Sequence, residues 1–421
     1  MTGIAEKQLR YAFAVTSGAT PESGKPEYWD GDILWATPED ISSLDSYWLT
    51  DTRRKITQAG YESCGTTTVP RGAIVLTKRA PIGQVAVLGE PACSNQGCFL
   101  LAPRGERDTR YFYYWLSAQT DHLQVLGRGS TFMELSTDEI KSLHVPDPPL
   151  PRQRAIADYL DRETARIDAL VAAKECLLGL LAEKRRALIT HVVTRGLDSD
   201  APLRDSGVPW LGEIPAHWAV WKLGHLALVG NGSTPNRDNP EYWAGGTVPW
   251  LNSSVVNQEE VTIADQFVTE TALRECHLPL VKPGSVLIGI TGQGKTRGQA
   301  VVLSFEATIN QHIAFVTPNV PGLDVWFLRW FLFAAYEFLR SISDDAGGTK
   351  GALTCEAVGA LRLPLPPLSD QRAIVDHVSS ETGKLDGLCS ATERTISLLK
   401  ERRAALIDAA VTGQADVESA S

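Results

Sequence analysis

The clearest chemical pattern in this sequence is at residues 289–296 (GITGQGKT), which fit the phosphate-loop pattern and follow the apolar run 286–288. Such a loop binds nucleotide phosphates because a helix follows it and directs backbone N–H groups at the ligand. Here residues 297–299 lead directly into another strand-like run, 300–303. The pattern therefore gives little support to nucleotide hydrolysis.

A second run, Asp147-Pro148-Pro149-Leu150, comes close to the Asp-Pro-Pro-aromatic motif that amino-methyltransferases use against a flipped adenine. It lacks the aromatic ring that would stack on the base, and a related run at 365–368 (LPPL) also lacks the acid. Prolines commonly stand just ahead of a helix, which accounts for both runs. The sequence contains no glycine-rich cofactor loop after a strand, no histidines with metal-ligand spacing and no nucleophile elbow. We therefore expect a non-catalytic chain with no metal site.

The composition is that of an ordinary globular protein, with 43% hydrophobic and 21% charged residues. No apolar run reaches the roughly 18 residues of a membrane span, and the first residues lack the regions of a signal peptide. The seven cysteines form neither CxxC pairs nor a disulfide framework, so we expect a cytoplasmic protein. The net charge of −10 argues against a strongly basic nucleic-acid binder, although a local basic surface can coexist with an acidic remainder.

The elements that would position any site occur twice in the chain. Residues 148–150, 153–156 and 163–164 (PPL, QRAI and ET) recur as 366–368, 371–374 and 381–382, an offset of 371 − 153 = 218. Near the start of each copy, the pattern from Thr20 to Trp35 recurs from Thr234 to Trp250, and the offset there is 234 − 20 = 214. The offset grows because residues were inserted into the second copy, which loops accept most easily. The long period predicts two domains, each with its own core, and excludes a solenoid.

Each copy begins with a globular part of α/β or α+β character. Short apolar runs bounded by glycine and proline predict strands at 73–76, 84–88 and 98–101, with counterparts at 285–288 and 300–303. One helix is expected at 110–126 and its counterpart at 325–341.

Each copy closes with a long helix that has a heptad seam. The first predicted seam is Leu160, Glu163, Ile167, Leu170, Lys174, Leu177, Leu181, Lys184 and Leu188. The second is Ile374, Val378, Glu381, Leu385, Leu388, Thr392, Thr395, Leu399, Arg402 and Leu406. Forty helical residues measure roughly 60 Å. We expect the helices to pair as an antiparallel coiled coil that holds the globular domains apart; the alternative is that each helix covers only its own domain.

Further motifs carry a family resemblance. They are the run from Thr20 to Trp35, residues 149–156 (PLPRQRAI) with 365–374 (LPPLSDQRAI), residues 183–189 (EKRRALI) with 400–407 (KERRAALI), the helix ends 193–196 and 411–413, and the linker 206–215 (SGVPWLGEIP) with His217-Trp218. On these motifs, which extend over nearly the whole chain, the sequence resembles the specificity subunit of type I restriction-modification systems.

The resemblance implies two target recognition domains, each contacting one half of a split sequence in double-stranded DNA. The paired helices would be a spacer and a docking surface for two methyltransferase subunits, and motor-nuclease subunits could join for restriction. S-adenosylmethionine, ATP and Mg²⁺ would then belong to the partner subunits. The implied order is recognition domain 1 at 1–150, long helix 1 at 151–197, a linker at 198–219, recognition domain 2 at 220–368, long helix 2 at 369–414 and a disordered tail at 415–421.

The duplication also indicates which residues contact DNA. Residues shared by the copies should be structural or bind phosphate, whereas divergent loops should contact bases. Arginine and lysine suit guanine, and glutamine and asparagine suit adenine. The candidate DNA-binding residues are Lys78, Arg79, Gln84, Arg128, Gln293, Lys295, Arg297, Gln299 and Lys350. Gly83-Gln84 with Gly298-Gln299, and Asn95-Gln96 with Asn310-Gln311, are shared by the copies, which favours scaffolding over a phosphate contact. For each basic residue the alternative is a solvated surface charge.

Other repeated residues leave alternatives open. Trp29, Trp35, Trp243 and Trp250 stand at matched positions, which favours core packing over base stacking. Arg185, Arg186, Arg402 and Arg403 could contact a methyltransferase or the DNA spacer, or could only solubilise the helices. The main alternative to a DNA-binding subunit is a coiled-coil adaptor without sequence-specific DNA binding, and a nucleotide-dependent enzyme rests on residues 289–296 alone.

Overall fold

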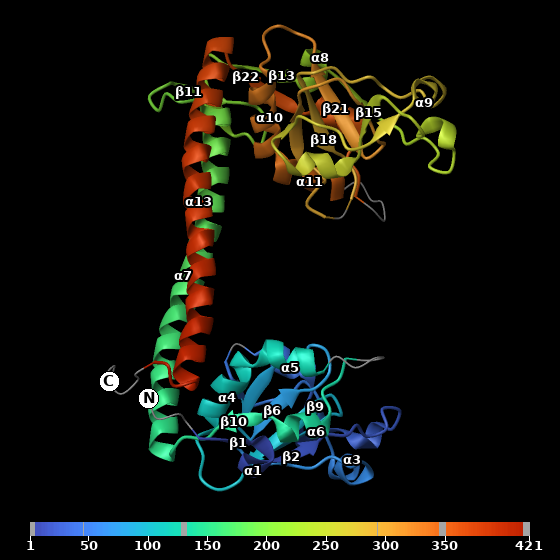
Figure 1. Ribbon diagram of the computed structural model, residues 1–421. Helices are drawn as coiled ribbons and strands as arrows, with labels where there is room; N and C mark the ends of the chain where they lie inside the picture. Colours follow the sequence, from blue (N-terminus) through green and yellow to red (C-terminus); the bar gives the residue numbers. More distant parts are fainter. Residues whose placement is uncertain (1–4, 45, 128–132, 293, 345–350, 416–421) are drawn as a thin grey trace. The chain divides into compact units, whose positions relative to one another are not determined.

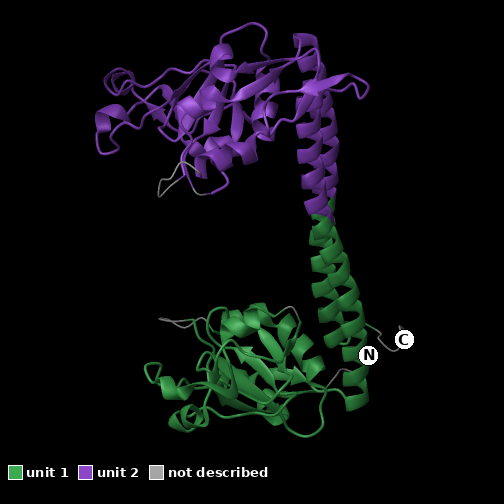
Figure 2. Ribbon diagram, turned by 180° about the vertical axis from the view of Figure 1, so that it is seen from behind, with its two compact units in different colours: residues 1–176, 392–421 green, residues 177–391 purple. Residues whose placement is uncertain are grey.

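A computed structural model describes residues 5–44, 46–127, 133–292, 294–344 and 351–415. The chain divides into two compact units (Figure 2), one of residues 1–176 with 392–421 and the other of residues 177–391. The predicted tail at 415–421 lies, apart from Ala415, outside the described residues. Each long helix contributes one part to each unit, because α7 spans Leu150–Arg195 and α13 spans Leu368–Val411 (Figure 1).

The first globular domain is built on two mixed β-sheets. One has the strand order β2-β9-β6-β7-β4 and the other the order β5-β3-β8. The strands of the larger sheet are β2 (Phe13–Ser17), β4 (Trp48–Leu49), β6 (Ile74–Thr77), β7 (Val85–Leu88) and β9 (Cys98–Pro103). Those of the smaller sheet are β3 (Trp29–Ala36), β5 (Lys55–Ile56) and β8 (Ala92–Ser94). Helices α4 (Thr109–Ala118) and α5 (Thr120–Leu126) replace the single predicted helix at 110–126.

The second globular domain repeats this topology strand for strand. Its sheets have the orders β14-β21-β18-β19-β16 and β17-β15-β20, and the parallel pairs β4·β7 and β3·β8 recur as β16·β19 and β15·β20. The strands are β14 (Ala227–Asn231), β15 (Val248–Leu251), β16 (Glu260–Val261), β17 (Phe267–Val268), β18 (Ser285–Gly289), β19 (Ala300–Leu303), β20 (Thr308–Ile309) and β21 (Ile313–Pro318). Helices α10 (Val325–Ala334) and α11 (Tyr336–Asp344) correspond to α4 and α5. The predicted tandem duplication of an α/β domain is confirmed.

The tryptophan pairs occupy equivalent places in the two smaller sheets. Trp29 and Trp35 meet edge to face with ring centroids 5.1 Å apart, and Trp243 and Trp250 do so at 5.2 Å. The Trp35 and Trp250 side chains are 5% and 2% exposed. Burial and mutual packing confirm a core role for Trp29, Trp35 and Trp250, and the half-buried Trp243 packs against this core.

The long helices pack antiparallel on each other inside each unit. In the first unit, Asp168 and Glu175 of α7 pair with Arg403 and Lys400 of α13 at 2.8 and 3.2 Å, so residue numbers rise along one helix and fall along the other. In the second unit, Arg185 of α7 pairs with Asp386 of α13. Among the described residues, no helix combines the length and the apolar character needed to cross a membrane.

Four of the nine predicted seam positions in α7 and four of the ten in α13 lie one residue before a seam position that is more buried. The buried and half-buried seam positions are Leu160, Thr164, Ile167, Val171, Lys174, Leu178, Leu181, Arg185 and Leu188 in α7, and Ile374, Val378, Thr382, Leu385, Cys389, Thr392, Ile396, Leu399 and Arg403 in α13. The predicted Leu170, Leu177 and Leu388 are instead 46%, 37% and 54% exposed. The predicted seam has spacings of three then four residues and the observed seam four then three, so the two have every second position in common. The prediction followed Leu170, Leu177 and Leu388 because they are apolar, although they are exposed.

A buried glutamine fixes the start of each long helix and explains the repeated Gln-Arg-Ala-Ile motif. The Gln153 side chain accepts from the Asp108 backbone N–H at 3.0 Å and donates to the Pro148 carbonyl at 2.8 Å. Gln371 makes the same bonds to Asp324 and Pro366 at 2.8 and 2.9 Å. Each glutamine thereby ties its helix to the N-terminus of α4 or α10.

Candidate nucleic-acid interface

Equivalent loops differ in length between the two domains. The loop between β6 and β7 runs from Lys78 to Gln84, which is seven residues, whereas the loop between β18 and β19 runs from Ile290 to Gln299, which is ten. Gly83 and Gly298 are the next-to-last residues of the two loops and have φ of 91° and 89°, in the region that favours glycine. The two loops therefore rejoin the sheet in the same way but contain different residues. Their difference in length agrees with the predicted insertion in the second copy.

In the first domain, Lys78 and Arg79 share one carboxylate. Glu134 lies 3.0 Å from the Lys78 ammonium and 3.0 Å from Arg79 Nε. The Lys78 ammonium also lies 5.1 Å from the centre of the Phe99 ring, and its side chain is only 13% exposed, against 49% for Arg79. Burial raises the pKa of Glu134, but the hydrogen bonds from Lys78 and Arg79 outweigh it and hold the pKa below its usual value. The carboxylate is therefore ionised at neutral pH and offsets part of the positive charge.

In the second domain, the predicted basic residues have different surroundings. Lys295 is exposed, and its carbonyl accepts from the Tyr336 hydroxyl at 3.0 Å. Arg297 is 3% exposed and pairs with Asp344 at 2.5 Å. Arg340 binds the loop from the side, donating to the Gly294 carbonyl at 2.7 Å. Contact between Arg297 and a base would require the ion pair with Asp344 to open.

The glutamines of the two loops are half-buried. The Gln84 side chain contacts the Ser42 hydroxyl, and the Gln299 backbone N–H donates to the Thr296 carbonyl at 3.1 Å. Gln84 also lies on the wall of a cavity of about 720 Å³, whose other lining residues include Tyr47, Trp48 and Tyr113. The remaining candidates, Arg128, Gln293 and Lys350, lie outside the described residues. A role in DNA binding stays a prediction for all nine candidates.

Residues shared by both copies serve the scaffold. The Asn95 side chain accepts from the Gly97 backbone N–H at 2.8 Å, and Asn310 accepts from His312 in the same way at 3.0 Å. The following residues, Gln96 and Gln311, take part in matched exposed hydrogen bonds with the hydroxyls of Thr20 and Thr234. The repetition of these threonines and glutamines is visible in the sequence, but the bond between them is not.

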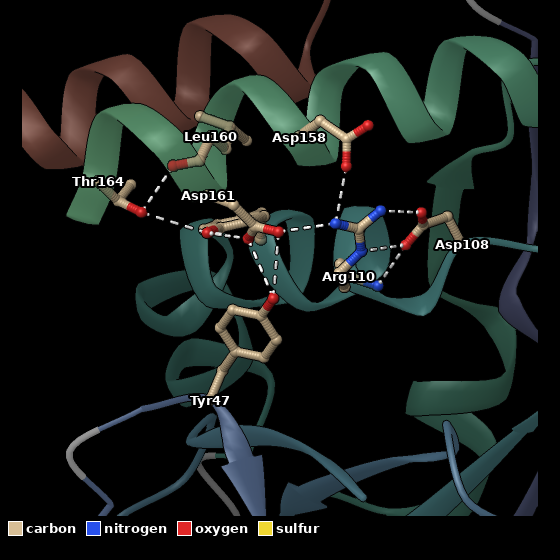
Figure 3. Close-up of polar contacts among 8 residues, drawn as sticks. Tyr47, Asp108, Arg110, Asp158, Leu160, Asp161 and Thr164 are labelled. Carbon is tan, nitrogen blue, oxygen red and sulfur yellow. Dashed lines mark hydrogen bonds and ion pairs between the residues drawn. The ribbon is translucent and has the colours of Figure 1, made fainter. Parts of the chain in front are cut away.

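A polar network joins the first domain to α7 (Figure 3). The Arg110 guanidinium bonds Asp108 at 2.6 Å, Asp158 at 2.8 Å and Asp161 at 2.7 Å. Hydrogen bonds to Asp108, with further help from Asp158 and Asp161, raise the pKa of Arg110 against the effect of burial. The Tyr47 hydroxyl donates to Asp161 at 3.1 Å, and burial together with the Asp161 charge raises the pKa of Tyr47 to about 12. The network fixes the first domain on α7.

The two chemical patterns considered first have structural roles. Residues 290–292 and 294–299, between β18 and β19, are not helical, so no helix follows the phosphate-loop pattern before β19, as predicted. Asp147 is tied to Lys7 and, at 3.0 Å, to Arg107. No group of three or more histidine, cysteine, aspartate or glutamate side chains suited to a metal ion occurs within the described ranges.

The fold defines a class of protein with a duplicated α/β domain, antiparallel long helices and unequal loops at equivalent places. A family model described as the type I restriction modification DNA specificity domain matches residues 3–175 and 215–387. The chain belongs to this family.

Several known proteins resemble nearly the whole chain. The type I restriction enzyme MjaIX specificity subunit of Methanocaldococcus jannaschii is 26% identical over 98% of this chain and 93% of its own length. A solved chain from work on complex assembly and conformational transition of the type I R-M system is 16% identical, with a TM-score of 0.74 and 98% of each chain covered. The HsdS subunit of Thermoanaerobacter tengcongensis is 17% identical, with a TM-score of 0.56 and the same coverage. At these identities the solved structures establish the likeness of the fold.

Proposed function

We propose that this chain is the non-catalytic, sequence-specific DNA-binding subunit of a type I restriction-modification complex. The observation that carries the proposal is one scaffold, present twice, with loops of different length and charge between equivalent strands. Two copies of one scaffold with different loops suit the recognition of two different half-sites, because shared contacts position a protein on DNA and divergent ones specify sequence.

The proposed division of labour follows the order of the chain. Residues 1–150 and 220–368 are the two target recognition domains, joined by the linker 198–219, and residues 151–197 and 369–414 are the long helices. The helices separate the recognition domains by a fixed length and provide the docking surface for two methyltransferase subunits. Methylation, with S-adenosylmethionine, and ATP-dependent cleavage by motor-nuclease subunits belong to the partners, and the assembly is cytoplasmic. The names of the family's known members support this assignment.

The test is to co-express the chain with the methyltransferase subunit encoded beside it, in a host without adenine methylation, and to map N6-methyladenine across the genome. The proposal predicts methylation at one split motif with a gap of fixed length. A stable complex that adds no methylation would refute sequence-specific recognition and favour a coiled-coil adaptor.

A further inference from the structure

A buried arginine in the second unit lacks the hydrogen bonds that such a group normally makes. Arg329 of α10 is 5% exposed, and its Nε and Nη1 have no hydrogen-bond partner among the described residues. Its guanidinium lies 3.9 Å from the centre of the Trp330 ring and 3.8 Å from the Glu259 carboxylate. Burial lowers the pKa of Arg329 to about 10, so the group is still charged at neutral pH. Glu259 is the carboxylate that pairs with Arg329 among the described residues.

Glu259 also reaches the long helices. Its carboxylate accepts from Arg185 of α7 at 2.5 Å, and Arg185 in turn pairs with Asp386 of α13. Charges of alternating sign thus run from the interior of the domain to both helices, in the order Arg329, Glu259, Arg185 and Asp386. One carboxylate serves two guanidinium groups that come from different elements.

The first unit has the same four positions with different chemistry. Glu259 precedes β16 as Tyr47 precedes β4, and Arg329 on α10 corresponds to Tyr113 on α4. The Tyr47 and Tyr113 rings pack with centroids 4.8 Å apart, where the second unit has a glutamate and an arginine. The helix pair keeps its own contact, because Arg403 and Asp168 are equivalent to Arg185 and Asp386.

We propose that Glu259 is a positioning residue, which sets the second recognition domain on the helix pair by joining Arg329 to Arg185. Its carboxylate is the only one of the four groups that contacts cations of both the domain and a long helix. Removing it leaves two arginines close together, one of them desolvated, so the domain must shift or admit water. The tyrosine pair of the first unit carries no such charge. This inference rests on the proposed function, since the position of a recognition domain sets the gap between half-sites.

The test compares Glu259→Gln with Glu260→Gln in the complete methyltransferase complex. Glu260 is the adjacent carboxylate and the first residue of β16, and it contacts Ser304 instead of an arginine. Methylation is measured on duplexes whose gap is natural, one base pair shorter or one base pair longer. We expect Glu259→Gln to lower the preference for the natural gap about threefold or more, a typical size for coupled contacts, and Glu260→Gln to leave it unchanged.

A double variant separates positioning from stability. Replacing Glu259 and Arg329 together by tyrosine installs the pair found in the first unit, and we expect it to restore a sharp gap preference. Equal loss of methylation at all three gaps in Glu259→Gln, without recovery in the double variant, would show a merely structural role and overturn the inference. An unchanged gap preference in Glu259→Gln would overturn it as well.

Hydrogen exchange of the full chain tests the junction independently of methylation. We expect faster exchange in α10 and around Arg185 for Glu259→Gln than for Glu260→Gln. If the wild-type complex methylates no split site, the proposed function fails, and equal exchange in the two variants would refute the junction itself.

Discussion

Glu134→Gln tests whether the first divergent loop contacts DNA. The substitution keeps the size of the side chain and removes the carboxylate that lies 3.0 Å from both the Lys78 ammonium and Arg79 Nε. The Arg79 side chain is 49% exposed, so the loss of its ion pair costs the fold about 1 kcal/mol or less. The loss of the pair with Lys78, whose side chain is 13% exposed, costs more. The effect on DNA binding should appear in its salt dependence, because two cations are released beside the proposed interface.

The expected magnitude follows from counterion release. Each phosphate contact adds about 0.9 to the slope of log K against log salt. Two released cations that both contact phosphate would steepen the slope by up to about 1.8, so raising the salt from 50 to 200 mM would cost roughly twelvefold more affinity than in the wild type.

The assay is fluorescence anisotropy of a labelled duplex that carries the mapped target, with the chain in its methyltransferase complex. Glu90→Gln is the control, since it removes the same charge from an exposed position of the same domain. A steeper slope with equal gains for all half-site variants would assign Lys78 and Arg79 to phosphate, and a change at one base position would assign them to base recognition. An unchanged slope and unchanged specificity would place the loop away from DNA and refute the reasoning.

Four further predictions follow from described contacts. Gln371→Ala should destabilise the second unit by about 2–4 kcal/mol, because it removes the hydrogen bonds to the Asp324 N–H and to two carbonyl groups at a buried site. Thermal unfolding measures the loss, and a smaller change in stability would contradict the anchoring role of Gln371. Burial raises the pKa of Asp147, yet Lys7 and Arg107 hold this pKa below the usual 3.8, so the ionised carboxylate stabilises the fold fully above pH 3.8 and less as the pH falls through the lower folded pKa. Asp147→Asn should therefore lower the stability at pH 7 and weaken the dependence of stability on pH in the acid range. If wild type and variant lose stability equally with falling pH, this linkage is disproved. Helix length is tested by inserting seven residues ahead of Lys184 and seven more after Asp386, which keeps the two helices in register. Each insertion lengthens its helix by about 10.5 Å, so the unread gap should grow by up to about three base pairs. Recovery of the original gap by methylome mapping would refute the spacer model. Arg297→Ala should relax recognition at one position of one half-site, whereas uniform weakening across sequences, tested on a panel of duplexes, would leave Arg297 a phosphate contact or a purely structural partner of Asp344.

Features that repeat in the sequence could be predicted well. The duplication, the long helices and the tryptophan pairs each appear as two copies of one pattern, and agreement between the two copies supports each prediction. Gln153 and Gln371 belong to a repeated motif, but neither their burial nor their hydrogen-bond partners could be predicted from it.

Features made by contacts between distant residues could not be predicted. Glu134 is 55 residues from Arg79, and Asp344 is 47 residues from Arg297, so no local pattern shows that the basic residues are paired. The same limit hid the cluster around Glu259, whose partners belong to other elements. Charge type alone therefore predicted candidate DNA contacts without revealing that Arg297 is buried.

The repeated ion pair of the helices explains why duplication suits this architecture. Helix α7 carries both Asp168 and Arg185, and α13 carries the equivalent residues Asp386 and Arg403. A helix with an aspartate in its first half and an arginine in its second half satisfies both when it packs antiparallel on a copy of itself. The contact then forms twice, once in each unit, and it needs no change when the two copies diverge. The junctions between domain and helix are free of that constraint, because each involves only one domain, and there the chain has a tyrosine pair in one copy and Glu259 with Arg329 in the other. Divergence at the junctions with conservation along the helix pair is what a protein requires if its two domains must differ while one shared spacer holds them.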